Sequence, residues 1–100
     1  SIEKMCCENY SCVKVLAKCV RALSGNPRKA LELADQVEML EEDVDELYAE
    51  SRRIMAELED LGMTRGAAIL LNEFMDAVEM VADWCENTVD IARAIAIRAF

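Results

Sequence analysis

Residues that interrupt helices are scarce in this chain, and they gather at two places. Its one hundred residues include a single proline and three glycines. In "SGNPRKA", Gly25 suits the position after a helix end, Asn26 an N-cap and Pro27 the first helical turn. In "EDLGMTRGAA", Gly62 marks a second break and Thr64 a second N-cap. The segments between these breaks are predicted to be helices, over residues 2–24, 27–59 and 64–99.

Apolar residues recur at steps of three and four along each segment, as they do in helices that share a core. The first segment has Cys6, Val13, Leu16, Val20 and Leu23. The second has Ala30, Leu33, Val37, Leu40, Val44, Leu47, Ser51, Ile54 and Leu58. The third has Ala67, Leu71, Phe74, Val78, Val81, Cys85, Thr88, Ala92, Ile95 and Ala99. We predict an all-α, antiparallel three-helix bundle that forms one domain over residues 1–100.

The third segment carries more apolar residues than one narrow seam needs. Beside its main stripe lie Ala77, Met80, Trp84, Val89 and Ile91. Two interpretations remain open: a helix packed against both others, or an additional surface for a second copy. A chain this short buries a limited core, so we predict that a homodimer completes the bundle.

Charge and cysteine content restrict the partners and the compartment. The net charge of −9 argues against nucleic acid and against an anionic membrane surface. Five cysteines with no CxxC spacing favour a reducing cytoplasm over a disulfide framework. We expect neither a signal peptide nor a membrane-spanning segment, since no uncharged run approaches ~18 residues. The first residue is Ser1 rather than Met, which leaves open a longer parent protein.

"EMVADWCENTVD" places an unusual acidic stripe on the third segment. Glu79, Asp83, Glu86 and Asp90 follow at steps of four, three and four, which keeps them on one helix face. No Lys or Arg occurs from residue 66 to residue 92. With Asp76, three residues before Glu79, the stripe contains four such neighbouring pairs. Like charges at these steps cost about 0.2 to 0.5 kcal/mol per pair, so the stripe costs on the order of 1 to 2 kcal/mol. A bound cation would turn this repulsion into attraction; a solvated acidic face is the alternative.

The antiparallel hairpin brings a second set of acids to the same heights. With Gly62 at the turn centre, Asp45 matches Glu79, Glu41 matches Asp83, and Glu38 matches Glu86. We predict a metal site whose first ligands are Glu41, Asp45, Glu79 and Asp83, extended by Glu38, Glu86 and Asp90. Carboxylates without histidine favour hard or intermediate cations, so magnesium, calcium, manganese and iron are candidates, with zinc also considered.

Two stretches resemble the PhoU-like family, in the branch found near phosphate permeases. These are "LEEDVDELYAESRRIM" at 40–55 and "VEMVADWCENTVDIARAIAI" at 78–97. The family repeats an E(D)xxxD motif on the long helices of a three-helix bundle, and some members carry transition-metal clusters there. Glu41 and Asp45 match the motif once, and Glu79 and Asp83 match it again. Glu86 and Asp90 continue the pattern.

The resemblance implies a non-enzymatic regulator of phosphate uptake that acts on a membrane transporter or a signalling protein. It covers roughly residues 30–100. Relatives often carry a second three-helix unit, which here would come from a partner copy or from a longer chain.

Two other functions remain open. A helical interaction bundle without metal needs only the heptad stripes. A MazG-like Mg²⁺-dependent nucleoside triphosphate pyrophosphohydrolase needs EExxE followed by ExxD. "EEDVD" at 41–45 approaches the first element, but the spacings from Glu79 to Asp83 and from Glu86 to Asp90 are one residue too long for the second.

Overall fold

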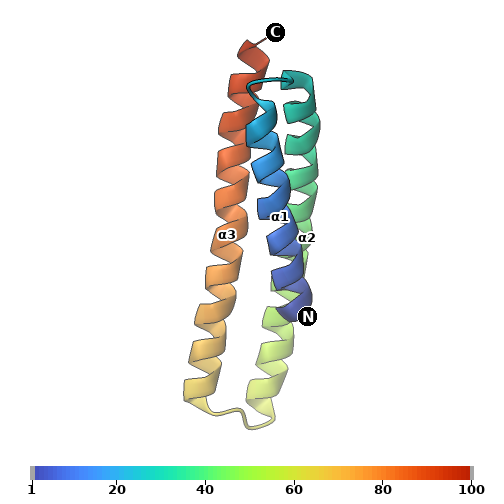
Figure 1. Cartoon of the computed structure of the whole chain (residues 1–100). Helices are drawn as coiled ribbons and strands as arrows, with labels where there is room; N and C mark the ends of the chain where they lie inside the picture. Colours follow the sequence, from blue (N-terminus) through green and yellow to red (C-terminus); the bar gives the residue numbers. More distant parts are fainter. Residues whose placement is uncertain (1, 100) are drawn as a thin grey trace.

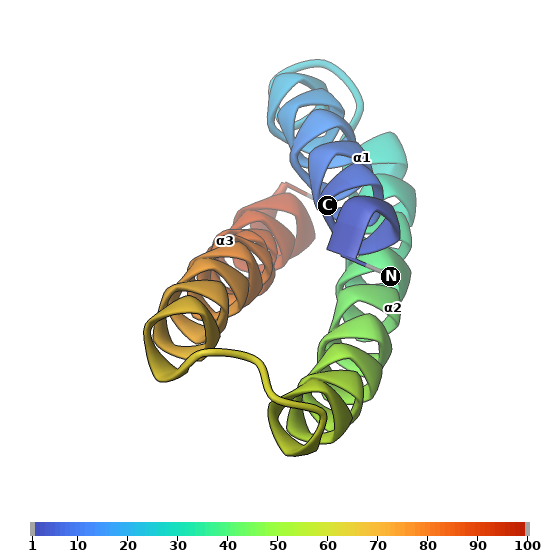
Figure 2. The same cartoon turned by 90° about the horizontal axis from the view of Figure 1, so that it is seen from below.

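The computed structural model describes residues 2–99, and in this range it contains three helices and no strand (Figure 1). The helices are α1 (Ile2–Ala22), α2 (Pro27–Asp60) and α3 (Arg65–Arg98). Each helix contacts the other two, and α2 runs antiparallel to α1 and α3 (Figures 1 and 2). The predicted all-α three-helix bundle is confirmed. The helix ends differ from the predicted ones by at most two residues, which is ordinary for frayed ends.

Local side-chain chemistry fixes both turns. The Asn26 side chain accepts a hydrogen bond from the Lys29 backbone N–H at 3.2 Å, and Pro27 opens α2. The Thr64 hydroxyl accepts one from the Ala67 backbone N–H at 3.2 Å and caps α3. Gly62 has a φ of +102°, which L side chains rarely adopt. Both N-caps are therefore those that the sequence predicts.

Small side chains build much of the core between the three helices. Its larger cluster includes Cys12 and Cys19 of α1, Val37 of α2, and Cys85 and Val89 of α3, all at most 3% exposed. The two α1 thiols donate hydrogen bonds to backbone carbonyls of α2, Cys12 to Val37 at 3.8 Å and Cys19 to Ala30 at 3.3 Å. Because these side chains are short, α1 can lie close to both long helices.

The predicted buried face is correct for most of α2 but wrong in part for α1 and α3. In α1, Val13 and Val20 are exposed, and the neighbouring cysteines are buried instead. In α3, Phe74, Val81 and Ile95 are exposed, whereas the inward positions hold Met75, Ala82, Val89 and Ala96. The close approach of the helices admits small residues and leaves bulkier apolar ones outside. Trp84 also lies outside the core of this chain.

α2 and α3 extend well beyond the N-terminal end of α1 (Figure 1). Near that end, Met5 of α1 packs with Val44 of α2 and Ala82 of α3. Beyond this level the two long helices form a hairpin without α1, and the molecule measures 57 × 16 × 16 Å. None of the described helices combines the length and the apolar character that a membrane span requires.

Candidate metal centre

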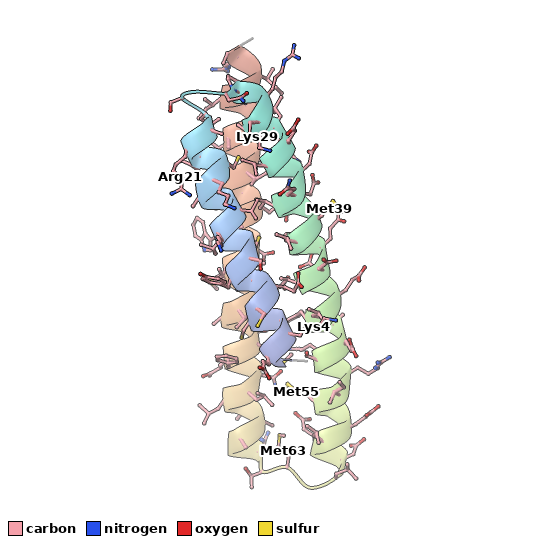
Figure 3. The ribbon with its side chains drawn as sticks, turned by 45° about the vertical axis from the view of Figure 1, so that its right-hand side comes forward. Lys4, Arg21, Lys29, Met39, Met55 and Met63 are labelled. Carbon is pink, nitrogen blue, oxygen red and sulfur yellow. The ribbon has the colours of Figure 1, made fainter. Side chains whose placement is uncertain are left out.

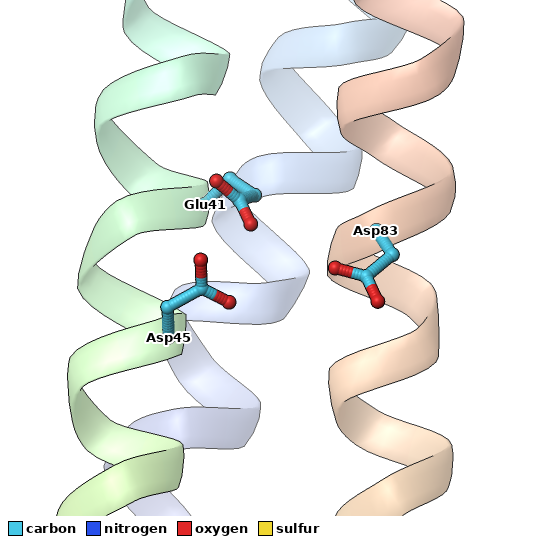
Figure 4. A group of neighbouring side chains, drawn as sticks. All are labelled: Glu41, Asp45 and Asp83. Atoms are coloured by element: carbon cyan, nitrogen blue, oxygen red, sulfur yellow. The ribbon is translucent and has the colours of Figure 1, made fainter.

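Three carboxylates converge in the groove between α2 and α3. Glu41 and Asp45 project from α2, and Asp83 projects toward them from α3 (Figure 4). One oxygen from each of the three lies within 4.8 Å of the others. Asp45 and Asp83 are exposed, so the group opens to solvent on one side. The antiparallel register that the sequence predicts therefore places Glu41 and Asp83 side by side.

Glu41 is the buried member of this group, with 4% of its surface exposed. Burial raises its pKa from an ordinary 4.5 to about 8, because an ionised carboxylate loses solvation there. A hydrogen bond with Asp45 and the negative charges of Asp45, Glu86 and Asp83 raise the pKa further. At neutral pH this carboxyl group therefore retains its proton for most of the time.

Glu79 stands one turn from Asp83 on α3 and behaves in the same way. Burial raises its pKa to about 8, and the hydrogen bond and charge of Asp45 and the charge of Asp83 act in the same direction. Its Oε2 atom is buried and has no hydrogen-bond partner. Buried oxygens are nearly always paired in proteins, so this atom is an available acceptor. Glu41, Asp45, Glu79 and Asp83 are called the carboxylate cluster below.

Basic side chains neutralise the acids at both ends of the stripe. On the side of the cluster toward the α1–α2 turn, the Arg93 guanidinium contacts Asp35 at 2.8 Å, Glu38 at 2.5 Å and Asp90 at 3.6 Å. The predicted extension of the site through Glu38 and Asp90 thus meets an arginine, and both carboxylates pair with it.

On the side of the cluster toward the α2–α3 turn, Asp76 of α3 has two partners on α2. It accepts a hydrogen bond from the Tyr48 hydroxyl at 2.5 Å and lies 3.5 Å from Arg52. The Arg52 guanidinium also stacks over the Tyr48 ring, 5.6 Å from its centre. The uncompensated charge is therefore concentrated in the middle of the groove. Glu86, the remaining predicted ligand, lies there too, close enough to raise the pKa of Glu41.

Sequence reasoning missed Asn9, the buried polar residue that α1 brings to the same region. Asn9 is 8% exposed, and its Nδ2 donates a hydrogen bond to the Val78 carbonyl of α3 at 3.0 Å. Its Oδ1 is buried and has no partner. One turn along α1, the pKa of the Cys12 thiol is raised to about 12 by its burial and by the neighbouring Cys85, with a smaller contribution from the charge of Glu41. The sequence does contain a signal for it, because Asn9 stands four residues after Met5 and three before Cys12, on the face of α1 that is buried.

Two surface hollows lie away from the carboxylate cluster. One, of about 360 Å³, lies between α1 and α2 and is lined by Lys4, Glu8, Asp43, Glu46, Leu47 and Glu50. The other, of about 320 Å³, lies near the turn that joins α2 and α3. The cluster itself is held between two helices, an arrangement that suits a small ion.

Comparisons with known proteins provide no family for this chain. No protein-family model, no curated protein and no solved structure matches it. The likeness to PhoU-like proteins stays a prediction from two short motifs. The features of the described chain that point to a function are the carboxylate cluster and the exposed apolar surface of the bundle.

Proposed function

We propose that this chain is a cation-binding regulatory bundle whose carboxylate cluster holds a divalent metal ion between α2 and α3. The observation that carries the proposal is the buried Glu41, whose carboxylate oxygen lies within 4.8 Å of oxygens from Asp45 and Asp83. The unpartnered Oε2 of Glu79 supplies a further acceptor beside them. Buried acids that crowd together are costly unless a proton or a cation separates them.

The donor set restricts the ion. The cluster offers carboxylate oxygens only, and such ligands suit Mg²⁺, Mn²⁺, Fe²⁺ and Ca²⁺ better than Zn²⁺, which prefers nitrogen and sulfur. The exposed side of Asp45 and Asp83 leaves space for water ligands. A bound ion would displace the protons that Glu41 and Glu79 hold near neutral pH.

The role assigned to the ion is regulatory. Ligands from α2 and α3 would fix the two long helices in one register, and metal occupancy would set the shape that the bundle presents to a partner protein. The PhoU-like motifs suggest that this partner is a membrane transporter or a signalling protein in phosphate uptake. This role involves protein contact and no chemical reaction.

Thermal unfolding with added cations tests the site. A cation that binds only the folded state, present at 100 times its dissociation constant, stabilises it by about 2.7 kcal/mol. We expect Mg²⁺, Mn²⁺ or Fe²⁺ to raise the Tm of the wild type after chelator treatment. The double variant Glu79→Gln/Asp83→Asn should lose this gain. A matched control, Glu42→Gln/Asp43→Asn, removes the same charge from exposed positions of α2 and should keep it.

Two results would contradict the proposal. One is a wild type whose Tm no cation raises. The other is a Glu79→Gln/Asp83→Asn variant that gains as much as the wild type. In either case the acids form a solvated face, and the protein is an interaction bundle without metal.

A further inference from the structure

α3 carries a second heptad seam on its outer side, away from the core of the bundle. Eight residues at alternating steps of four and three form this outer stripe: Leu70, Phe74, Ala77, Val81, Trp84, Thr88, Ile91 and Ile95. All of them except the half-buried Thr88 are exposed. The core of the bundle uses other positions of the same helix, among them Met75, Ala82 and Val89. A repeat of this regularity on an exposed face is typical of a helix that pairs with another helix.

The size and the charge of the outer stripe fit a stable interface. Leu70, Trp84 and Ile91 are each about two-thirds exposed, at 68%, 65% and 64%. The six large side chains of the stripe expose on the order of 650 Å² per copy, close to the about 800 Å² that each partner gives to a standard interface. None of the eight positions carries a charge. Such a patch is larger than a monomer ordinarily exposes.

We propose that the occupant of this seam is a second copy of the chain, with the two α3 helices antiparallel across a two-fold axis. The axis passes between Val81 and Trp84. Four kinds of pair then form, each twice: Leu70 with Ile95, Phe74 with Ile91, Ala77 with Thr88, and Val81 with Trp84. Any stripe with alternating steps of four and three can pair with a second copy of itself in this way, but its spacing does not determine which side chains are large and which are small. In this chain the two smaller residues, Ala77 and Thr88, face each other, and every large residue faces another apolar one.

The first helix widens this interface. Val13 and Val20 of α1 are 44% and 48% exposed. They follow Asn9 by four and eleven residues, so they share the face of α1 on which Asn9 binds the Val78 carbonyl of α3. Because Cys12 also lies beside Cys85, the two valines stand at about the heights of Trp84 to Ile91 and continue the outer stripe across the α1–α3 side of the bundle.

Charge placement permits two chains of net charge −9 to associate through this face. Glu79 and Glu86 lie on the side of α3 opposite the outer stripe, and Asp83 points into the α2 groove (Figure 4). These three acids are therefore held away from the two-fold axis. Glu73 shares the side of Trp84 and Ile91, but it lies toward one end of the interface, about 14 Å along the helix from the axis. The two carboxylate clusters of the dimer would lie on its outer flanks, so dimerisation does not depend on metal.

Charged substitutions at the central pair test both the interface and its direction. Val81→Glu alone and Trp84→Lys alone each place a charge against an apolar residue, and each should weaken dimerisation about 100-fold in sedimentation equilibrium. An equimolar mixture of the two variants should recover most of the affinity. In the antiparallel pairing one Glu–Lys contact forms, and the other Val81–Trp84 contact remains native. A parallel pairing would bring no such partners together.

Met39→Glu is the matched control. Met39 is 66% exposed on α2, nearly the same as Trp84, and Figure 3 shows it pointing away from the bundle. This variant should dimerise like the wild type. Circular dichroism verifies the fold of each variant, and because Val81 and Trp84 are exposed, we expect native helix content.

The single tryptophan offers a second readout. Trp84 emission in the wild type should shift to longer wavelength on dilution as the dimer dissociates. A wild type that sediments at the chain mass of 11.2 kDa at micromolar concentration would overturn the proposal. So would a dimer that Val81→Glu leaves intact, or variants that fail to recover on mixing. If the Glu79→Gln/Asp83→Asn variant remains a dimer, the interface forms whether or not the carboxylate cluster binds a metal ion, and the two proposals are tested independently.

Discussion

At the scale of single residues, burial separates two carboxylates that the sequence presents as equals. Glu41 and Asp45 stand one turn apart in the same motif, yet Glu41 is 4% exposed and Asp45 lies at the surface. The same loss of hydration that gives Glu41 a pKa of about 8 makes its ionised form dependent on a nearby positive charge. Arg93 and Arg52 neutralise acids at the two ends of the stripe, and the proposed cation would neutralise those in its middle.

The metal-free protein should become less stable as pH rises. Glu41 and Glu79 have folded-state pKa values of about 8, above the ordinary 4.5, so the folded chain holds protons that the unfolded chain has released. The resulting stabilisation is complete below pH 4.5 and is lost as pH rises through 8. We expect the free energy of unfolding in urea to be on the order of 1 to 3 kcal/mol lower at about pH 8.5 than at about pH 5.5.

The variant Glu41→Gln tests whether Glu41 causes this pH dependence of the free energy of unfolding. The amide keeps the shape of the side chain without its charge, so the variant should show a flatter pH profile and exceed the wild type at about pH 8.5 when chelator is present. Glu50→Gln removes an exposed acid from the same helix and should keep the wild-type slope. Stability that rises with pH across this window in the wild type would refute the assigned protonation.

At the scale of helices, the turn between α2 and α3 depends on one backbone conformation. An added Cβ meets no atom within 4 Å at either Gly62 or Gly66, so substitution there tests conformation without a clash. Gly62→Ala should cost about 1 kcal/mol because φ is +102°. Gly66→Ala lies in the first turn of α3 and should stabilise by about 0.5 to 1 kcal/mol.

Thermal unfolding of the two glycine variants, measured at one protein concentration, provides this comparison. The Tm values should move in opposite directions from that of the wild type. Equal shifts would mean that the turn tolerates both backbone conformations. In that case Gly62 would not set the register that aligns Glu41 with Asp83.

At the scale of the whole molecule, the short α1 divides the bundle into a three-helix part and a two-helix part. Hydrogen exchange should follow this division, since an amide opens more readily where fewer apolar groups are packed against its helix. We expect amides of residues 51–60 and 65–74 to exchange at least about tenfold faster than those of residues 33–44 and 82–92, after correction for intrinsic rates. Uniform protection along α2 and α3 would contradict this expectation.

Local signals in the sequence are sufficient to predict the three helices, their turns and the heights of the acids. Asn26, Pro27, Gly62 and Thr64 act through contacts within a few residues, and such local effects can be predicted without knowledge of the fold. Once the turn around Gly62 is placed, antiparallel geometry aligns Glu41 with Asp83.

The rotation of each helix about its own axis depends on packing between the helices and could not be predicted from local signals. α3 has apolar residues on two adjoining faces, so periodicity alone could not distinguish the inner seam of Ala82 and Val89 from the outer stripe of Val81 and Trp84. Which of the two faces is buried depends on how closely the three helices approach one another, and the face with small side chains is buried where that approach is close. The same packing buries Glu41 and brings Arg93 to Asp35 and Glu38. The sequence alone could not place these contacts, because they join residues far apart in the chain.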